Sequence, residues 1–206
     1  METISVTHIY SARNNLLAIL EETGYDVSEY AHCGIQQVGA MMDQKQLDLL
    51  LTHKNGKKIF VKFYLDGRLN IASEACSFYE SNEDEPPILT KEDNLMIIVK
   101  MDPNDALIAA LNTLWNDSQI YASVINIKRL QFNILKHVQV PKHEILTVEE
   151  QAEVFKQHNI QTIADLPAIS RYDPVALVLC MRPGMVCRIT RKSKTSVSTF
   201  YYRACV

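Results

Sequence analysis

Two apolar segments on either side of an amphipathic helix are the most constraining feature of the sequence. Residues 95–99 read Leu-Met-Ile-Ile-Val, which is typical of a strand that is covered on both faces. Apolar residues at helical spacing over 107–115 predict a helix, with Asp102 as the N-cap and Pro103 at the first helical position. Residues 120–127 then return as another strand. The order strand, helix, strand predicts an α/β core.

The residues before this core predict a helix and a small sheet. Apolar side chains share one face over 7–23, and Gly24 can end that helix in the left-handed conformation. Asn55-Gly56 and Asp66-Gly67 each favour a two-residue hairpin turn, because such turns need positive φ at their centre. Two hairpins in tandem predict an antiparallel meander of three strands over 47–72, the last strand at 68–72. The acidic residues 80–87 end in two prolines and predict a surface loop.

The second half of the chain predicts a smaller unit, which divides the protein into domains 1–130 and 131–206. Thr147 and Glu150 form a capping box at the start of a helix that ends near Asn159. In that helix the apolar residues Val148, Ala152 and Phe155 recur at helical spacing. A second, short helix is expected from Asp173 and Pro174 to Cys180, followed by strands at 185–190 and 199–205 around a basic hairpin tip at 191–198.

Charge is distributed unevenly along the 206 residues. Residues 1–130 carry 11 Lys or Arg and 18 Asp or Glu, while residues 131–206 carry 10 and 6. The stretch 182–206 holds six basic residues and no acidic one. Such a segment favours an acidic or polyanionic partner, although a solvated basic face gives the same pattern. Charge alone does not choose between a protein and a nucleic acid.

Composition argues against several functional classes. The five cysteines lie at 33, 76, 180, 187 and 205, without metal-like spacing, and therefore predict thiols in a reducing compartment and no zinc. No stretch approaches the 18 apolar residues of a membrane span, and residues 1–10 lack the pattern of a signal peptide, so we expect no membrane association. The six glycines are dispersed and form no phosphate-binding loop.

The strongest catalytic candidate lies in the expected meander. Metal-dependent nucleases of the restriction type use two carboxylates and a lysine to hold a divalent ion and the attacking water. Asp48 and Lys62 can supply one acid and the lysine, but Phe60 occupies the position of the second acid. One carboxylate does not build a magnesium site, so we expect no nuclease activity. His137 and His143 flank Pro141 without a third ligand nearby, and they are interpreted as structural or interfacial residues.

The C-terminal third carries a series of ordered motifs. They are Val-Pro-Lys-His at 140–143, Leu-Pro at 166–167, Asp-Pro-Val-Ala at 173–176, Arg-Lys-Ser-Lys-Thr at 191–195 and Tyr-Arg at 202–203. This series resembles the C-terminal assembly domain of the fifth subunit of eukaryotic-type DNA-directed RNA polymerases, a domain that in archaea exists alone as a small polymerase subunit. Over residues 1–136 the resemblance rests on the order of elements.

The resemblance implies a fold and a role. The fold is a nuclease-like N-terminal jaw domain with a mixed sheet, followed by a small α+β assembly domain. The role is that of a non-catalytic structural subunit, without cofactor or small-molecule substrate, that docks on the largest polymerase subunit and lines the channel for downstream duplex DNA. The expected interface residues are His137, Pro141, His143, Asp173, Pro174, Arg191, Lys192, Thr195, Tyr202 and Arg203.

A second charged surface is expected to lie near DNA. Lys54, Lys57 and Lys58 cluster at the Asn55-Gly56 turn, where they can contact phosphates or simply keep the tip soluble. The alternative function is a free-standing DNA-binding module derived from an inactive nuclease fold.

The source of the chain is a further prediction. A divergent first domain joined to a well-matched second domain suggests a viral homologue of the African swine fever virus type. That source implies location in the host cytoplasm, in viral factories, and in the virion. A cellular homologue is expected in the nucleus.

Overall fold

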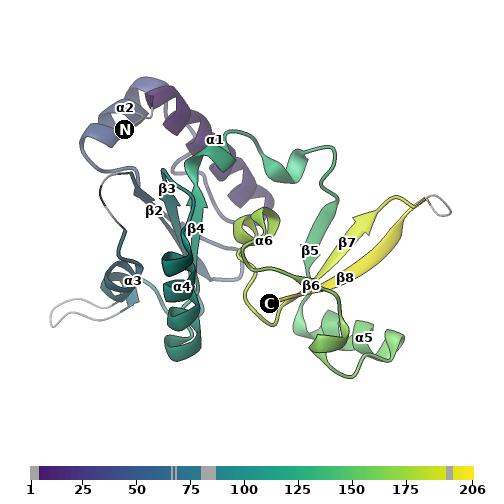
Figure 1. The fold of residues 1–206 in the computed structure, drawn as a ribbon. Coiled ribbons are helices and arrows are strands. Elements are labelled where there is room, and N and C mark those ends of the chain that lie inside the picture. The colour runs from purple at the N-terminus through teal and green to yellow at the C-terminus, as the bar shows by residue number, and fades with distance from the viewer. Residues whose placement is uncertain (1–4, 66, 68, 80–86, 194–196) are drawn as a thin grey trace. The chain divides into compact units, whose positions relative to one another are not determined.

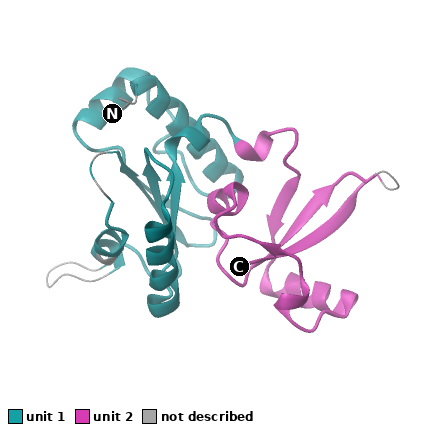
Figure 2. Ribbon diagram, in the orientation of Figure 1, with its two compact units in different colours: residues 1–133 teal, residues 134–206 magenta. Residues whose placement is uncertain are grey.

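The chain forms two compact units, unit 1 over residues 1–133 and unit 2 over residues 134–206 (Figure 2). Each unit has its own mixed sheet (Figure 1). Each also has its own buried apolar residues. The domain boundary expected from the sequence lies after residue 130. The structure is a computed structural model, and it describes residues 5–65, 67, 69–79, 87–193 and 197–206.

Unit 1 is an α/β unit built on a four-stranded sheet of order β1-β2-β3-β4. The pair β1–β2 is antiparallel, whereas β2–β3 and β3–β4 are parallel. Strand β3 is buried along its whole length, since α1 packs with α2 and α3 with α4 around the sheet. The elements are α1 Val6–Glu22, α2 Ile35–Asp43, β1 Leu49–Thr52, β2 Lys58–Tyr64, α3 Ile71–Tyr79, β3 Asn94–Val99, α4 Asp105–Ser118, β4 Ala122–Asn126 and the 3-10 turn η1 Ile127–Leu130.

The first helix and the strand–helix–strand core are confirmed. Helix α1 ends where the chain turns at Gly24, which has φ +100°. Its end is closed by two hydrogen bonds, from the N–H of Gly24 to the carbonyl of Glu21 and from the N–H of Tyr25 to the carbonyl of Leu20. The stretch from β3 through α4 to β4 forms the parallel crossover that the apolar segments predict.

The third strand of the expected meander is wrong. Ile71 and Ala72 begin helix α3, and β2 pairs on its free side with β3 instead. The ring of Phe78 in α3 packs on the ring of Phe60 in β2, with 4.5 Å between ring centroids. This contact across the face of the sheet favours a helix at 71–79. The expected turn residue Asp66 and the loop 80–86 lie outside the described residues.

The hairpin between β1 and β2 also differs from the expected two-residue turn. Strand pairing stops at Thr52 and Lys58, and the N–H of Gly56 donates to the carbonyl of His53 over 2.8 Å. Gly56 has φ +82°, but Asn55 does not have positive φ. A longer turn therefore closes the hairpin, with a glycine in the left-handed region at its end.

The expected N-cap of α4 is displaced along the chain. The side chain of Asn104, rather than that of Asp102, accepts a hydrogen bond from the N–H of Leu107 at 2.9 Å. The Asp102 carboxylate lies 3.0 Å from Arg129 in an exposed ion pair. Asparagine caps helices about as well as aspartate, so the nearer residue takes this role.

Unit 2 is a small α+β unit on a second four-stranded sheet of order β5-β7-β8-β6. The pairs β5–β7 and β7–β8 are antiparallel, and β6–β8 is parallel. The elements are the 3-10 turn η2 Ile134–Lys136, β5 Lys142–Ile145, α5 Val148–His158, the 3-10 turn η3 Ile163–Asp165, β6 Ala168–Ile169, α6 Pro174–Val178, β7 Val186–Arg191 and β8 Thr199–Cys205.

Local signals of unit 2 are largely confirmed. Thr147 and Glu150 form the capping box of α5, and Asn159 ends that helix in the left-handed conformation. The apolar spacing in α5 is confirmed only in part, because Val148 is 81% exposed and Ala152 is exposed, whereas Phe155 is partly buried. Val154 is buried in the core beside Leu146, Val186 and Ala204, and Phe155 packs against the same cluster. The described helices include none that is long and apolar enough to cross a membrane.

Candidate functional site

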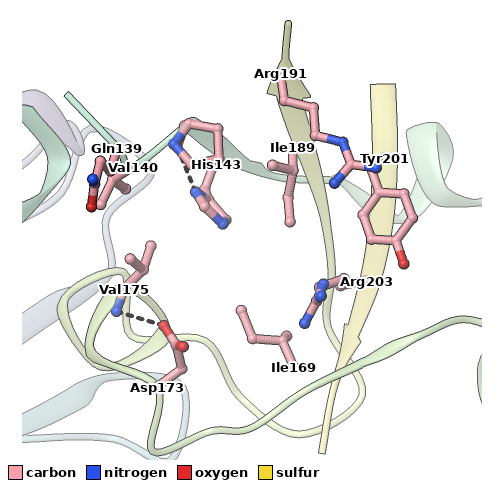
Figure 3. Close-up of a pocket in the computed structure, with 11 residues that line it drawn as sticks. Gln139, Val140, His143, Ile169, Asp173, Val175, Ile189, Arg191, Tyr201 and Arg203 are labelled. Carbon is pink, nitrogen blue, oxygen red and sulfur yellow. Dashed lines mark hydrogen bonds between the residues drawn. The ribbon is translucent and has the colours of Figure 1, made fainter. Parts of the chain in front are cut away.

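An open hollow of about 250 Å³ lies on the sheet face of unit 2 that carries α6 (Figure 3). It gathers residues from the turn before β5, from β5 itself, from β6, from the start of α6 and from the β7–β8 hairpin. Its lining consists of Gln139, Val140, Pro141, His143, Ile169, Asp173, Val175, Ile189, Arg191, Tyr201 and Arg203.

Strand alternation decides which side chains reach the hollow. Ile189 is paired with Tyr201 in register, so these two residues and their second neighbours Arg191 and Arg203 share one face. The intervening residues of β7 and β8 point to the opposite face, which packs against α5. The register of the hairpin therefore brings two arginines and a tyrosine to one wall of the hollow.

Both arginines are held against the ring of Tyr201. The guanidinium carbon of Arg191 lies 4.7 Å from the ring centroid, and that of Arg203 lies 5.6 Å from it. Nη1 of Arg203 also donates to the carbonyl of Ala168 over 3.1 Å. Within the described part of the chain, neither guanidinium forms an ion pair. This wall presents positive charge that the unit does not neutralise by itself.

On the opposite face of the sheet, Arg188 forms an ion pair within unit 2. Arg188 donates to Glu144 from Nε and Nη2, at 3.1 and 2.8 Å. Hydrogen bonds from Lys142 and from Arg188 lower the pKa of the Glu144 carboxyl below its usual value. The charge of Arg188 is therefore balanced within the unit.

The second wall of the hollow carries hydrogen-bond acceptors. Nδ1 of His143 donates to the carbonyl of Pro141 over 2.7 Å, which in the neutral ring leaves Nε2 as an acceptor. Asp173 accepts from the N–H of Val175 at 2.9 Å and so caps α6. Figure 3 shows the ring of His143 and the side chain of Arg203 pointing toward the centre of the hollow.

The cysteines of unit 2 take no part in this surface. Burial raises the pKa of Cys180 to about 12 and that of Cys205 to about 11, and it also raises the pKa of Cys187. These thiols stay protonated at neutral pH and act as apolar side chains.

Half of the expected interface residues lie together in the hollow. They are Pro141, His143, Asp173, Arg191 and Arg203. Pro174 is next to them as the first residue of α6, and Lys192 is exposed just after β7. His137 lies in an exposed turn, where its Nδ1 accepts from the N–H of Gln139 at 3.3 Å. Thr195 lies outside the described residues.

Tyr202 is on the other face of the sheet, where its ring lies 5.6 Å from that of His158. The tyrosine of the hollow is its neighbour Tyr201, which the sequence analysis missed. Alternation from Arg203 along β8 was the available signal, since Tyr201 is its second neighbour and Tyr202 is not.

The candidate DNA-proximal residues are placed as expected at one hairpin tip. Lys54, Lys57 and Lys58 are exposed around the turn at Gly56. The amide N–H of Lys58 is engaged by the carboxylate of Asp93 at 2.6 Å, while its side chain stays on the surface.

The residues of the nuclease hypothesis do meet in unit 1, without forming a metal site. The Lys62 ammonium lies 3.0 Å from the Asp48 carboxylate, and Phe60 stacks on Phe78 beside it. Among the described residues, no three His, Cys, Asp or Glu side chains are grouped to hold a metal ion. The positive charge of Lys62 is balanced by Asp48, and its ammonium lies 5.9 Å from the centroid of the Phe78 ring.

Comparison with known proteins identifies the family. The family model described as RNA polymerase Rpb5, C-terminal domain, matches residues 132–205. The DNA-directed RNA polymerase subunit Rpo5 of Thermococcus kodakarensis is 45% identical over 76 residues, which cover 37% of this chain and 92% of that protein. Rpo5 of Staphylothermus marinus is 46% identical over 71 residues, 34% of this chain and 77% of that protein.

A plant relative extends the similarity across unit 1. The subunit named DNA-directed RNA polymerases IV and V subunit 5B of Arabidopsis thaliana is 27% identical over 203 residues, which cover 94% of this chain and 88% of that protein. The matched C-terminal region contains the whole of the hollow in unit 2. The chain belongs to the Rpb5/Rpo5 family of DNA-directed RNA polymerase subunits.

Proposed function

We propose that the chain is a non-catalytic subunit of a DNA-directed RNA polymerase, in which unit 2 docks on the largest subunit through the face of the hollow. The observation that carries the proposal is the pair of arginines, Arg191 and Arg203, left without an ion pair in the described structure of a region that matches the family. Charged groups that a folded unit leaves unpaired and preorganised are suited to a complementary partner.

Reversing these two charges tests the docking surface. We expect Arg191→Glu with Arg203→Glu to lower the amount of this chain that co-purifies with the largest subunit by about tenfold or more, since like charges across an interface cost several kcal/mol. The measurement is the ratio of the two chains after affinity purification through the largest subunit.

Lys136→Glu with Lys156→Glu is the matched control. It makes the same change in net charge at two exposed positions of unit 2 outside the hollow. The control is expected to assemble normally. Equal recovery of both double variants would remove the hollow from the docking surface.

In the same proposal, unit 1 acts as a jaw beside downstream duplex DNA. Its point of contact is the tip of the β1–β2 hairpin with Lys54, Lys57 and Lys58, called the lysine tip below. The supporting observation is three exposed lysines at one tip of a unit that is otherwise acidic. The nuclease-like ancestry of this jaw is part of the proposal, supported by the closeness of Asp48 and Lys62 and by the aromatic residue in place of a second acid.

The contribution of the tip is measurable in the assembled polymerase. Lys54→Glu with Lys57→Glu is expected to reduce the slope of log binding constant against log salt, by about 0.9 for each phosphate that the tip no longer neutralises. The isolated chain is expected to bind duplex DNA weakly. Tight, steeply salt-dependent binding by the isolated chain would favour the alternative, a free-standing DNA-binding module.

The relatives described above come from archaea and from a plant. They are compatible with a nuclear location for a cellular homologue. The viral source, with its host-cytoplasm and virion locations, stays a prediction of the sequence.

A further inference from the structure

We propose that the hollow of unit 2 binds one acidic side chain of the largest polymerase subunit, with its carboxylate between Arg191 and Arg203 and a neighbouring hydrogen-bond donor facing His143 and Asp173. The inference rests on the proposed docking function and specifies the chemistry of the partner at that surface.

The wall of the hollow that carries Arg191 and Arg203 supplies hydrogen-bond donors, and it is preorganised for a carboxylate. A guanidinium has five N–H donors, and Arg203 uses one of them on the carbonyl of Ala168. Stacking on Tyr201 limits the motion of both arginine side chains. Less conformational entropy is therefore lost when an anion binds, which favours a specific contact over a diffuse positive surface.

The arginines on the two faces of the sheet in unit 2 differ in their ion pairs, and this difference indicates which face binds the acidic side chain. Arg188 is satisfied by Glu144 within the unit, whereas no described acidic group pairs with Arg191 or Arg203. The cations that need an external anion are thus on the hollow face of the hairpin.

The wall of the hollow that carries His143 and Asp173 orients the ligand. In the neutral ring Nε2 of His143 is an acceptor, and the carboxylate of Asp173 is an acceptor as well, so a carboxylate placed against them would be repelled. A protein segment satisfies both walls when its acidic side chain faces the arginines and an N–H or hydroxyl group faces the histidine.

Charge and the apolar part of the lining favour a carboxylate side chain over a phosphate. The two arginines and one aspartate of the lining carry a formal charge of +1, which matches a carboxylate better than a phosphate dianion. Ile169, Val175 and Ile189 supply apolar contacts for the methylene groups of such a side chain. The volume of about 250 Å³ is below the range of about 300–1,000 Å³ that is typical of small-molecule pockets.

Carbodiimide coupling tests the contact directly. The reagent joins a carboxylate to a primary amine as an amide, with no spacer, and it does not couple arginine. Arg203→Lys keeps the positive charge and places an amine in the hollow. In polymerase purified through its largest subunit, we expect a new amide between position 203 and an Asp or Glu of the largest subunit, identified by mass spectrometry and absent from the wild type.

Arg188→Lys is the matched control on the other face of the sheet. Its amine is expected to couple within the chain, to Glu144, in competition with Lys142, whose ammonium already lies 2.6 Å from that carboxylate. As an independent measurement, Arg203→Gln is expected to lower retention of this chain in the polymerase about tenfold at moderate salt, and Arg203→Lys to lower it less.

The outcomes separate the inference from the function on which it rests. Coupling of position 203 to no partner carboxylate, or only to Asp173 of its own chain, in a correctly assembled polymerase overturns the acidic ligand and leaves the docking function standing. Coupling to an acidic residue of a different subunit supports the acidic ligand and overturns docking on the largest subunit. Absence of the wild-type chain from the purified polymerase overturns both.

Discussion

Gly24→Ala is expected to reduce the free energy of unfolding of unit 1 by about 3 kcal/mol. The first cause is the backbone, because Gly24 has φ +100° and an L side chain in the left-handed region costs about 1–2 kcal/mol. The second cause is a collision, since the new Cβ would lie 2.8 Å from Nε2 of His53.

Moving the His53 ring would break a small network. Nε2 of His53 lies 3.0 Å from the carbonyl of Thr23, to which it donates, and Nδ1 accepts from the N–H of Asn55 at 3.0 Å. The ring also lies edge-on to Tyr25, at 5.0 Å between centroids. One hydrogen bond contributes about 1 kcal/mol, so breaking the bond to Thr23 adds to the backbone strain.

Gly56→Ala separates the two causes. Gly56 has φ +82°, but its added Cβ meets nothing within 4 Å. This variant should therefore be destabilised only by the strain of about 1–2 kcal/mol. The single tryptophan of the chain, Trp115, lies in unit 1, so its fluorescence during urea unfolding reports on that unit. Equal destabilisation of the two variants would contradict the role of the His53 ring.

Elements with strong local signals are predictable from the sequence. The capping box of α5 and Pro174 of α6 specify helix starts through contacts within a few residues, and strand β8 coincides with the expected 199–205. Helix α3 was missed because its signal is not local. Phe78 packs on Phe60, a residue of a strand that is distant in sequence, and β3 pairs with the edge of β2 on which the strand expected at 68–72 would lie.

The candidate site in unit 2 also has a part that the sequence predicts and a part that depends on the fold. Motif positions such as His143, Asp173, Arg191 and Arg203 were identified from the sequence, and the structure brings all four to one hollow. The choice between Tyr201 and Tyr202 depends on the register of β8, where a change of one residue exchanges the two faces of the sheet. That no described acidic residue pairs with Arg191 or Arg203 follows from the register of β5 and β7, which places Glu144 opposite Arg188, and sequence spacing does not predict this register.

Asp93→Asn is the second substitution with a large expected effect, a loss of about 2–3 kcal/mol of unfolding free energy at pH 7. Asp93 is 5% exposed and joins the start of β2 to the turn before β3. One carboxylate oxygen accepts from the N–H of Lys58 at 2.6 Å, and the other accepts from the N–H and the hydroxyl of Thr90, both at 2.7 Å. An asparagine would turn an NH2 group toward one of these donors.

The same hydrogen bonds make the contribution of Asp93 to the free energy of unfolding depend on pH, and the sign of this dependence follows from its pKa. Burial by itself would raise the pKa of Asp93, but the hydrogen bonds from Lys58 and Thr90 outweigh it and hold the pKa below its usual value. A lowered pKa in the folded state means that the stabilisation is present above the unfolded pKa of about 3.9 and is lost as the pH falls through the folded value. Protonated Asp93 then presents a hydroxyl where an acceptor is needed, as the asparagine does with its NH2 group.

The stability difference between the wild type and Asp93→Asn should therefore be constant above about pH 5, and it should shrink as the pH falls below the unfolded pKa of about 3.9 and through the lower folded value. Urea unfolding followed by Trp115 fluorescence at several pH values measures it, and other carboxylates cancel because both proteins contain them. Asp102→Asn is the matched control, since its exposed pair with Arg129 contributes less than about 1 kcal/mol. A difference that stays constant over this range would show that the charge of Asp93 does not stabilise the junction between β2 and β3.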